Sequence, residues 1–368
     1  MSTPPIVRLE PALAQHWWSD VAACRAVLRH HSKTFHAASL LLPARVRAPA
    51  SVLYGFCRLA DDAVDVDGGQ LDAVAVLQQR LDRVYSGRPL PVPADRALAG
   101  VVAAYAIPKA LPEFLLEGLA WDAAGREYET FDELLAYAAR VAGTVGAMMS
   151  LLMETREPDA LARACDLGVA MQLSNIARDV GADAQLGRLY LPGAWLREAG
   201  MDDAATRAWR AVPVRDARVE AVVLRLIAEA DRLYARAGAG VSCLPLACRP
   251  GINAARLMYA AIGHQVRRAH GDGLTRRARV GGWHKALLVA RGSVGLWPAR
   301  AQLQAPPLPA NLPLLAAVAS HPAPPAQSSA EFVIDLFTRL TQQTQQNQQM
   351  QQAQALRSTR FDREEHLA

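Results

Sequence analysis

Apolar residues recur with helical spacing along most of the chain. From about residue 15 to 298 they return every three or four positions, and the alternating β-branched and aromatic runs typical of strands are missing. Clusters of proline and glycine divide this pattern into helices, at 86–95, 106–112, 188–195 and 244–251. We therefore predict an all-α domain, and the lack of a fixed repeat argues against a solenoid.

The pattern changes after Trp297. A Pro/Ala-rich stretch is followed by "SSAEFVIDLFTRL", in which Ser328 and Glu331 have capping-box spacing ahead of an apolar stripe, and then by a Gln-rich run. We expect a solvated extension, with a partner-binding tail as the alternative. The predicted parts are a helical domain at 15–298, a linker at 299–328 and a tail with one short amphipathic helix at 329–368.

Composition narrows the class of protein. The 368 residues are 51% hydrophobic, which is enough to bury a large core. The net charge of +5 comes from scattered arginines, which favours anionic ligands or a membrane surface over a nucleic-acid partner. Five cysteines without CxxC spacing indicate neither a disulfide framework nor a zinc site. No signal peptide and no apolar run of roughly 18 residues is evident, so we expect a cytoplasmic, soluble or peripheral protein.

An acidic cluster lies inside an apolar segment. The stretch "RLADDAVDVD", which begins at Arg58, carries four aspartates. On a helix, Tyr54, Arg58, Asp61 and Asp65 share one narrow face, and apolar residues fill the opposite side. Like charges one turn apart repel, and burial of ionised carboxylates without partners costs far more. The cluster therefore either faces solvent at a helix end or is neutralised by a ligand.

A second polar stripe favours the ligand. Within 159–192, one face of an otherwise apolar helix carries Gly168, Gln172, Asn175, Asp179 and Asp183. Proteins hold Mg²⁺ through one or two carboxylates, waters and substrate phosphate oxygens, and arginines suit bidentate phosphate binding. The two stripes, with the nearby Arg58, Arg178 and Arg188, predict a magnesium cluster that binds a diphosphate. Two unrelated stripes with internal hydrogen bonds are the alternative.

These motifs resemble the signatures of the squalene/phytoene synthase family of isoprenoid synthases. The first stripe is similar to that family's DxxxD motif, and "NIARDVGAD" is similar to NxxRDxxxD. "HSKTFHAASLLLP" at 31–43, "YAARVAGTVGAMM" at 137–149 and "GRLYLP" at 187–192 resemble further family motifs, although Thr34 replaces a serine. The similarity runs from about residue 20 to 298 and leaves out the tail.

The resemblance implies a fold and a set of site residues. The fold is a single large helical domain of the isoprenoid synthase type around a central apolar cavity. The implied metal ligands are Asp61, Asp65, Asn175, Asp179 and Asp183. The implied catalytic residues are Asp61, Asp65, Arg58, Tyr54, Tyr137, Arg178, Tyr190 and Tyr259. The residues implied to bind the diphosphates or line the pocket for the isoprenoid tails are His31, Ser32, Phe35, Val141, Gly143, Gly146, Gln172, Arg188 and Arg276. Close helix packing is an alternative role for the small residues among them.

The resemblance also implies a reaction. Two identical prenyl diphosphates condense head to head through a cyclopropyl diphosphate, with Mg²⁺, or Mn²⁺ as a substitute. The amino-acid sequences of the segments "YGFCRLADDAVD" and "MQLSNIARDVGADAQLGRLYLP" most resemble those of bacterial phytoene synthases of carotenoid pathways. We therefore expect two geranylgeranyl diphosphates to form phytoene by way of prephytoene diphosphate. The squalene branch of the family uses NADPH, and no GxGxxG motif between a strand and a helix supports that cofactor here, so we expect no NADPH.

Other activities stay open. A squalene or dehydrosqualene synthase would use farnesyl diphosphate, and a non-catalytic assembly factor would be expected to have lost metal ligands. A head-to-tail prenyltransferase would share "DDAVD" but would carry a second DDxxD motif. The insoluble substrate tails and the alternation of basic residues with Trp and Leu at 281–300 predict a transient, peripheral contact with the inner face of the membrane. Downstream carotenoid enzymes are further expected partners.

Overall fold

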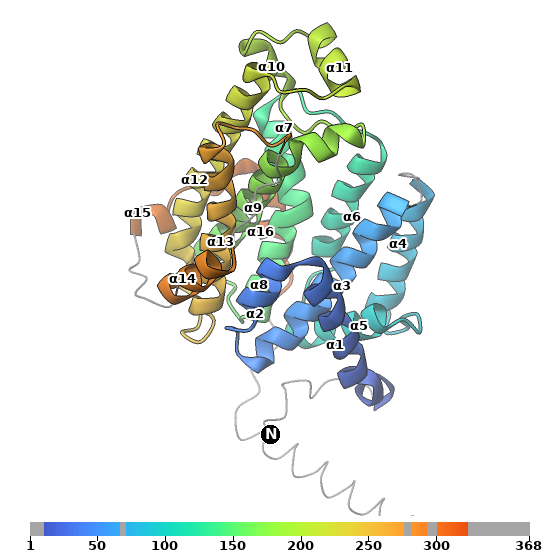
Figure 1. Cartoon of the computed structure of the whole chain (residues 1–368). Coiled ribbons are helices and arrows are strands. Elements are labelled where there is room, and N and C mark those ends of the chain that lie inside the picture. The colour runs from blue at the N-terminus through green and yellow to red at the C-terminus, as the bar shows by residue number, and fades with distance from the viewer. Residues whose placement is uncertain (1–10, 67–70, 276–280, 293–299, 323–368) are drawn as a thin grey trace, which may run out of the picture. The chain divides into compact units, whose positions relative to one another are not determined.

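The structure is built from helices (Figure 1). The computed structural model describes residues 11–66, 71–275, 281–292 and 300–322, and no strand occurs within them. The longer helices are α1 (Pro11–His31), α3 (Ala44–Val66), α4 (Leu71–Tyr85), α5 (Pro93–Tyr105), α6 (Ala110–Ala123), α9 (Pro158–Gln185), α12 (Ala217–Val241) and α13 (Arg249–Arg268). The shorter ones are α2 (Lys33–Ser39), α7 (Phe131–Ala138), the π-helix η1 (Ala139–Gly143), α8 (Thr144–Leu152), α10 (Gly193–Glu198), α11 (Asp203–Ala211), α14 (Gly282–Gly292), α15 (Arg300–Leu303), the 3₁₀ helix η2 (Pro309–Asn311) and α16 (Leu312–Ala319). The all-α prediction is confirmed.

The predicted interruptions separate helices. They fall between α4 and α5, α5 and α6, α9 and α10, and α12 and α13. Pro93, Pro158 and Pro250 each stand in the first turn of a helix, where a missing amide hydrogen breaks no helical hydrogen bond. Local sequence therefore fixes where these helices begin.

Helix α9 runs through the middle of the domain. It packs along α12 on one side and against η1 and α8 on another (Figure 1). A Cβ atom at Gly168 would lie 2.1 Å from the carbonyl oxygen of Ala142, and one at Gly146 would lie 2.1 Å from that of Ala164. Only glycine allows so close an approach. The η1–α8 segment therefore lies directly against the α9 backbone.

Among the described residues, one continuous helix is long and apolar enough to cross a membrane. It comprises α7, η1 and α8, from Phe131 to Leu152, and 61% of its most apolar window is buried inside the protein. Its small residues pack against α9 in the core. By its surroundings this segment is a core helix.

The compact helical unit extends beyond the predicted boundary at residue 298, to Pro322. The sequence assigns 299–328 to a linker, but residues 300–322 contain α15, η2 and α16, and α16 packs against α6, α8 and α9. Arg156 donates hydrogen bonds from its guanidinium to the carbonyl oxygens of His321, at 2.9 Å, and Ala106, at 2.8 Å. The high proline content of residues 300–322 thus led to the prediction of a linker where the structure has a packed segment. The predicted tail at 329–368 lies outside the described residues.

Candidate active site

A cavity of about 290 Å³ lies beside α9. A buried water needs roughly 10 to 15 Å³ of such space, so the cavity is large enough for an organic ligand. Its mostly apolar lining comes from α1, α2, α3, η1, α8, α9, α12 and α13. Helix α9 contributes a stripe from Ala160 to Asn175, in which Arg163 lies toward the amino end of the helix and Gln172 and Asn175 lie toward its carboxyl end. Tyr54 adds a polar group from α3.

The acidic stripe of α3 is half-exposed. Arg58 donates from Nη1 to Oδ2 of Asp61 at 2.8 Å and also pairs with Asp62. The three side chains are 31%, 45% and 44% exposed. Helix geometry accounts for the contacts, because residues three and four apart share a face. The side chain of Asp65 lies outside the described residues.

The acidic stripe of α9 is more deeply buried. Arg178 donates from Nε to Oδ1 of Asp179 at 2.9 Å, and the two side chains are 17% and 16% exposed. Burial raises the pKa of Asp183 to about 7, with a further contribution from the charge of Asp179, while Arg188 acts in the opposite direction. The Asn175 amide is 3.4 Å from Oε1 of Gln172. Oxygen donors thus follow α9 from the cavity to its last turn.

The residues on these stripes fit a hard divalent cation. Carboxylates and an amide oxygen are the donors that Mg²⁺ prefers, and burial together with the charge of Asp179 raises the pKa of Asp183, which a cation beside it would lower again. Among the described side chains, no group of three His, Cys, Asp or Glu residues lies close enough together to hold a metal ion. Arg58 and Arg178 instead pair with Asp61 and Asp179.

An aromatic cluster joins α2, α3 and α13 at the cavity. The Phe35 ring lies 5.0 Å from that of Tyr259 and 6.2 Å from that of Tyr54, measured between centroids. Ser32 caps α2 by accepting a hydrogen bond from the Phe35 amide at 3.3 Å. Burial raises the pKa of Tyr259 to about 12, so its phenol is neutral at physiological pH. The cluster presents aromatic faces beside the cavity.

A second cluster surrounds Asp122, which is not among the site residues predicted from the sequence. The hydroxyls of Tyr137 and Tyr190 each donate to a different carboxylate oxygen of Asp122 at 2.8 Å, and their rings stack with centroids 5.2 Å apart. Burial, then the charge of Asp122, raises the pKa of both tyrosines. Asp122 also contributes to the raised pKa of Asp183. A lone aspartate in the apolar run "LLEGLAWDAA" was the available sequence signal.

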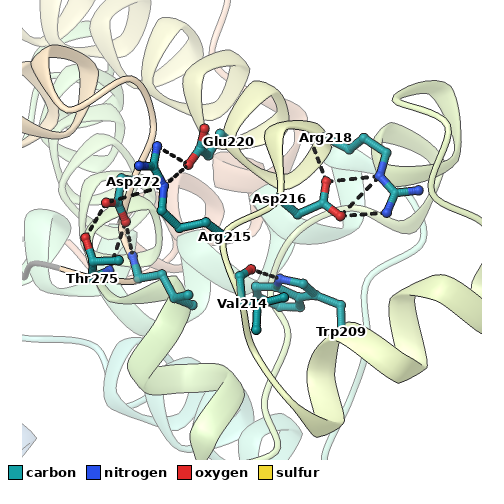
Figure 2. Close-up of polar contacts among 9 residues, drawn as sticks. Trp209, Val214, Arg215, Asp216, Arg218, Glu220, Asp272 and Thr275 are labelled. Carbon is teal, nitrogen blue, oxygen red and sulfur yellow. Dashed lines mark hydrogen bonds and ion pairs between the residues drawn. The ribbon is translucent and has the colours of Figure 1, made fainter.

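Polar contacts brace the loop that follows α13 (Figure 2). Asp272 accepts hydrogen bonds from the amides of Leu274, at 3.0 Å, and Thr275, at 2.9 Å. Arg215 links Asp272, at 3.7 Å, to Glu220 of α12, at 2.7 Å. The loop also packs on α9 itself, where a Cβ atom at Gly181 would lie 2.9 Å from Cα of Leu274. Arg276 follows directly but lies outside the described residues.

The remaining predicted residues separate into two groups. Val141 and Gly146 line the cavity. Gly143 does not: a Cβ atom there would lie 3.2 Å from Leu314 and 3.3 Å from Asn311, because the π-helical turn directs it toward the C-terminal segment. His31 is the exposed last residue of α1.

The fold and this cavity define an isoprenoid synthase. The crystal structure of a dehydrosqualene synthase in complex with a ligand is similar with a TM-score of 0.70 and 29% identity, covering 76% of this chain and 97% of that one. The chain belongs to the squalene/phytoene synthase family, whose family model matches residues 28–284.

Curated relatives are more similar still. The phytoene synthase of Cereibacter sphaeroides is 57% identical over 270 residues, which are 71% of this chain and 75% of that protein. The phytoene synthase of Rhodobacter capsulatus is 53% identical over 279 residues, which are 75% of this chain and 81% of that protein.

Proposed function

We propose that this protein is a phytoene-forming prenyltransferase of carotenoid biosynthesis. It joins two geranylgeranyl diphosphates head to head through prephytoene diphosphate and releases diphosphate. One observation carries the proposal: a large, mostly apolar cavity lies along α9, and carboxylates and an arginine follow on the same helix about one to two turns beyond it. Hydrocarbon tails fit the first part and diphosphates the second. The identity of 57% and 53% to proteins named phytoene synthase supports the choice of product.

The cation of the proposed site is Mg²⁺, with Mn²⁺ as a substitute, and NADPH takes no part. Asp61, Asp65, Asn175, Asp179 and Asp183 would hold it. When bound, the cation neutralises the charge that develops on the departing diphosphate. The raised pKa of Asp183 supports this assignment, because a nearby positive charge would stabilise the ionised carboxylate.

Side chains of this protein would bind the diphosphates, stabilise the carbocation and exclude water. The guanidinium groups of Arg58 and Arg178, oriented by their aspartates, add bidentate contacts to phosphate oxygens. The hydroxyls of Tyr137 and Tyr190 both donate hydrogen bonds to Asp122, and these bonds hold the two rings in place. Neutral aromatic rings stabilise a carbocation through their π faces. The apolar lining excludes the water that would quench it.

The proposed location is the cytoplasmic face of a membrane, with downstream carotenoid enzymes as partners. On α14, Trp283 is 87% exposed and Leu287, one turn later, is 60% exposed. Arg291, which is also exposed, follows on the same face. Exposed Trp and Leu beside a basic residue suit an interfacial helix. Flotation with anionic vesicles at low salt tests this: association should fall in Trp283→Ser, and no association of the unaltered protein would contradict it.

A product assay tests the proposed reaction. The purified protein is incubated with Mg²⁺ and either geranylgeranyl or farnesyl diphosphate, without NADPH, and the hydrocarbon is identified by mass. Phytoene is expected, and chelation of the cation should stop its formation. A preference for farnesyl diphosphate would assign the dehydrosqualene activity of the structural neighbour instead. No hydrocarbon from either substrate would refute the proposal.

A further inference from the structure

A buried arginine lies at the end of the cavity remote from the carboxylates. Arg163 belongs to the stripe of α9 that lines the cavity. It precedes Asn175 by twelve residues and Asp179 by sixteen. At a rise of about 1.5 Å per residue, these separations correspond to roughly 18 and 24 Å along the helix axis. Arg163 is therefore placed where the end of a long hydrocarbon tail would arrive.

Arginine is a costly residue for this place. Its side chain is fully buried, and burial lowers the pKa of its guanidinium. Neither Nε nor Nη2 makes a hydrogen bond within the described residues, although Nε forms an ion pair. An apolar side chain of similar size would line a hydrocarbon cavity without desolvating a charge. Packing alone therefore does not explain why an arginine occupies this position.

Those contacts hold the side chain in one position. Nη1 of Arg163 donates to the carbonyl oxygen of Gln302 at 2.6 Å, and Nε lies 3.0 Å from Oδ2 of Asp166. The stem packs closely against α12 at Gly240, where an added Cβ atom would lie only 2.3 Å from Cβ of Arg163. A tail that pressed on this side chain would have to break a charge-assisted hydrogen bond.

The segment 300–311 is itself fastened to the domain. Arg236 of α12 donates from Nε to Asp166 at 2.9 Å and from Nη2 to the carbonyl oxygen of Pro306 at 2.6 Å. Asn311 donates to the other oxygen of Asp166 at 3.0 Å. The acceptor for Arg163 is thus part of a braced structure, which lies beyond the residues 28–284 matched by the family model.

We propose that Arg163 is a specificity-determining residue that closes the far end of the cavity and limits the length of the prenyl tail. The inference rests on the proposed function and adds to it the residue that sets chain length. The C-terminal segment acts through Arg163 by fixing the position of its side chain at the cavity wall. Geranylgeranyl tails fit in front of this side chain, and a tail one isoprene unit longer meets it.

Relative rates on three substrates test the inference. Wild type, Arg163→Ala and Arg156→Met are compared on farnesyl, geranylgeranyl and geranylfarnesyl diphosphate with Mg²⁺. In Arg163→Ala, the kcat/KM for geranylfarnesyl relative to geranylgeranyl diphosphate should rise about tenfold or more, since even one methylene in an apolar pocket is worth about that factor. Arg156→Met is the matched control, because Arg156 holds the C-terminal segment at the carbonyl oxygen of His321 and does not line the cavity.

The control should melt at a lower temperature with an unchanged substrate ratio. An unchanged ratio in folded Arg163→Ala would overturn the inference, and so would an equal change in both variants, which would assign the effect to the segment as a whole. If Arg163→Ala does not fold, Arg163→Leu must shift the ratio in the same direction by a smaller factor. A wild type that converts none of the three substrates would instead refute the proposed function.

Discussion

The two acidic helices carry similar residues in different surroundings. On α3, Asp61 and Asp62 are 45% and 44% exposed and share Arg58. On α9, Asp179 is 16% exposed, and burial raises the pKa of its neighbour Asp183 to about 7. Water screens charge on α3, whereas charge on α9 must be balanced by specific neighbours. The α3 part of the proposed cation site thus forms at little cost in free energy. We expect the α9 part to be completed only when a ligand binds.

Loss of a ligand carboxylate is expected to have the largest effect, and to affect both helices alike. Asp61→Asn and Asp183→Asn should each lower kcat by about a thousandfold or more, because several kcal/mol of transition-state charge stabilisation is lost. Product formation under saturating Mg²⁺ and geranylgeranyl diphosphate measures this. Circular dichroism should show an unchanged helical content. Turnover near the wild-type rate in either variant would contradict the assigned ligand.

Loss of an arginine should destabilise the protein more on α9 than on α3. Arg178→Met leaves the buried Asp179 without its bidentate partner and should lower the free energy of unfolding by about 3 kcal/mol. Arg58→Met, on the exposed helix, should lower it by at most about 1 kcal/mol. Urea unfolding without Mg²⁺ measures both. Equal losses would mean that the difference in exposure has no energetic consequence.

Ligands should stabilise the protein only in combination. A ligand that binds the folded state alone adds about 2.7 kcal/mol at a hundredfold excess over Kd. Mg²⁺ without phosphate oxygens, or a thiolo analogue of geranylgeranyl diphosphate without a cation, should each shift the melting temperature little. Together they should shift it by more than the sum. Asp183→Asn should lose this excess, and purely additive shifts in the wild type would refute the linkage.

The sequence predicted what depends on near neighbours along the chain. The stripes on α3 and α9 follow from residues three and four apart, and proline positions marked the helix boundaries. The Asp122 cluster could not be found in this way, because its tyrosines come from residues 137 and 190. Only the fold brings these three side chains together.

Two further misses have local physical causes. The resemblance to the family placed Gly143 with the cavity residues, but Gly143 ends the π-helical turn η1 and faces Leu314 and Asn311 of the C-terminal segment. The segment 300–322 contains many prolines and was assigned to a linker, yet scattered arginines hold it by its carbonyl oxygens. Single arginines far apart in sequence form no pattern that predicts such contacts.

A last prediction is a pH dependence of stability that belongs to α9. The Asp183 carboxyl titrates near its ordinary pKa of 3.8 when unfolded and at about 7 when folded. Between these values the folded state keeps a proton that the unfolded state has lost. The free energy of unfolding therefore falls as pH rises from about 4 to 7, by at most about 1.4 kcal/mol per pH unit, and the contribution is constant outside this interval.

Urea unfolding of the metal-free protein between pH 5 and pH 8 measures this slope. Other groups titrate in the same range, so the informative quantity is the difference between variants. Asp183→Asn should remove the Asp183 contribution and flatten the curve, whereas Asp61→Asn should keep the wild-type slope. Bound Mg²⁺ and diphosphate favour the ionised carboxylate, so binding of the analogue with Mg²⁺ should weaken below pH 7 and release a proton. Calorimetry in two buffers of different ionisation enthalpy measures that proton, and its absence would show that Asp183 does not contact the cation.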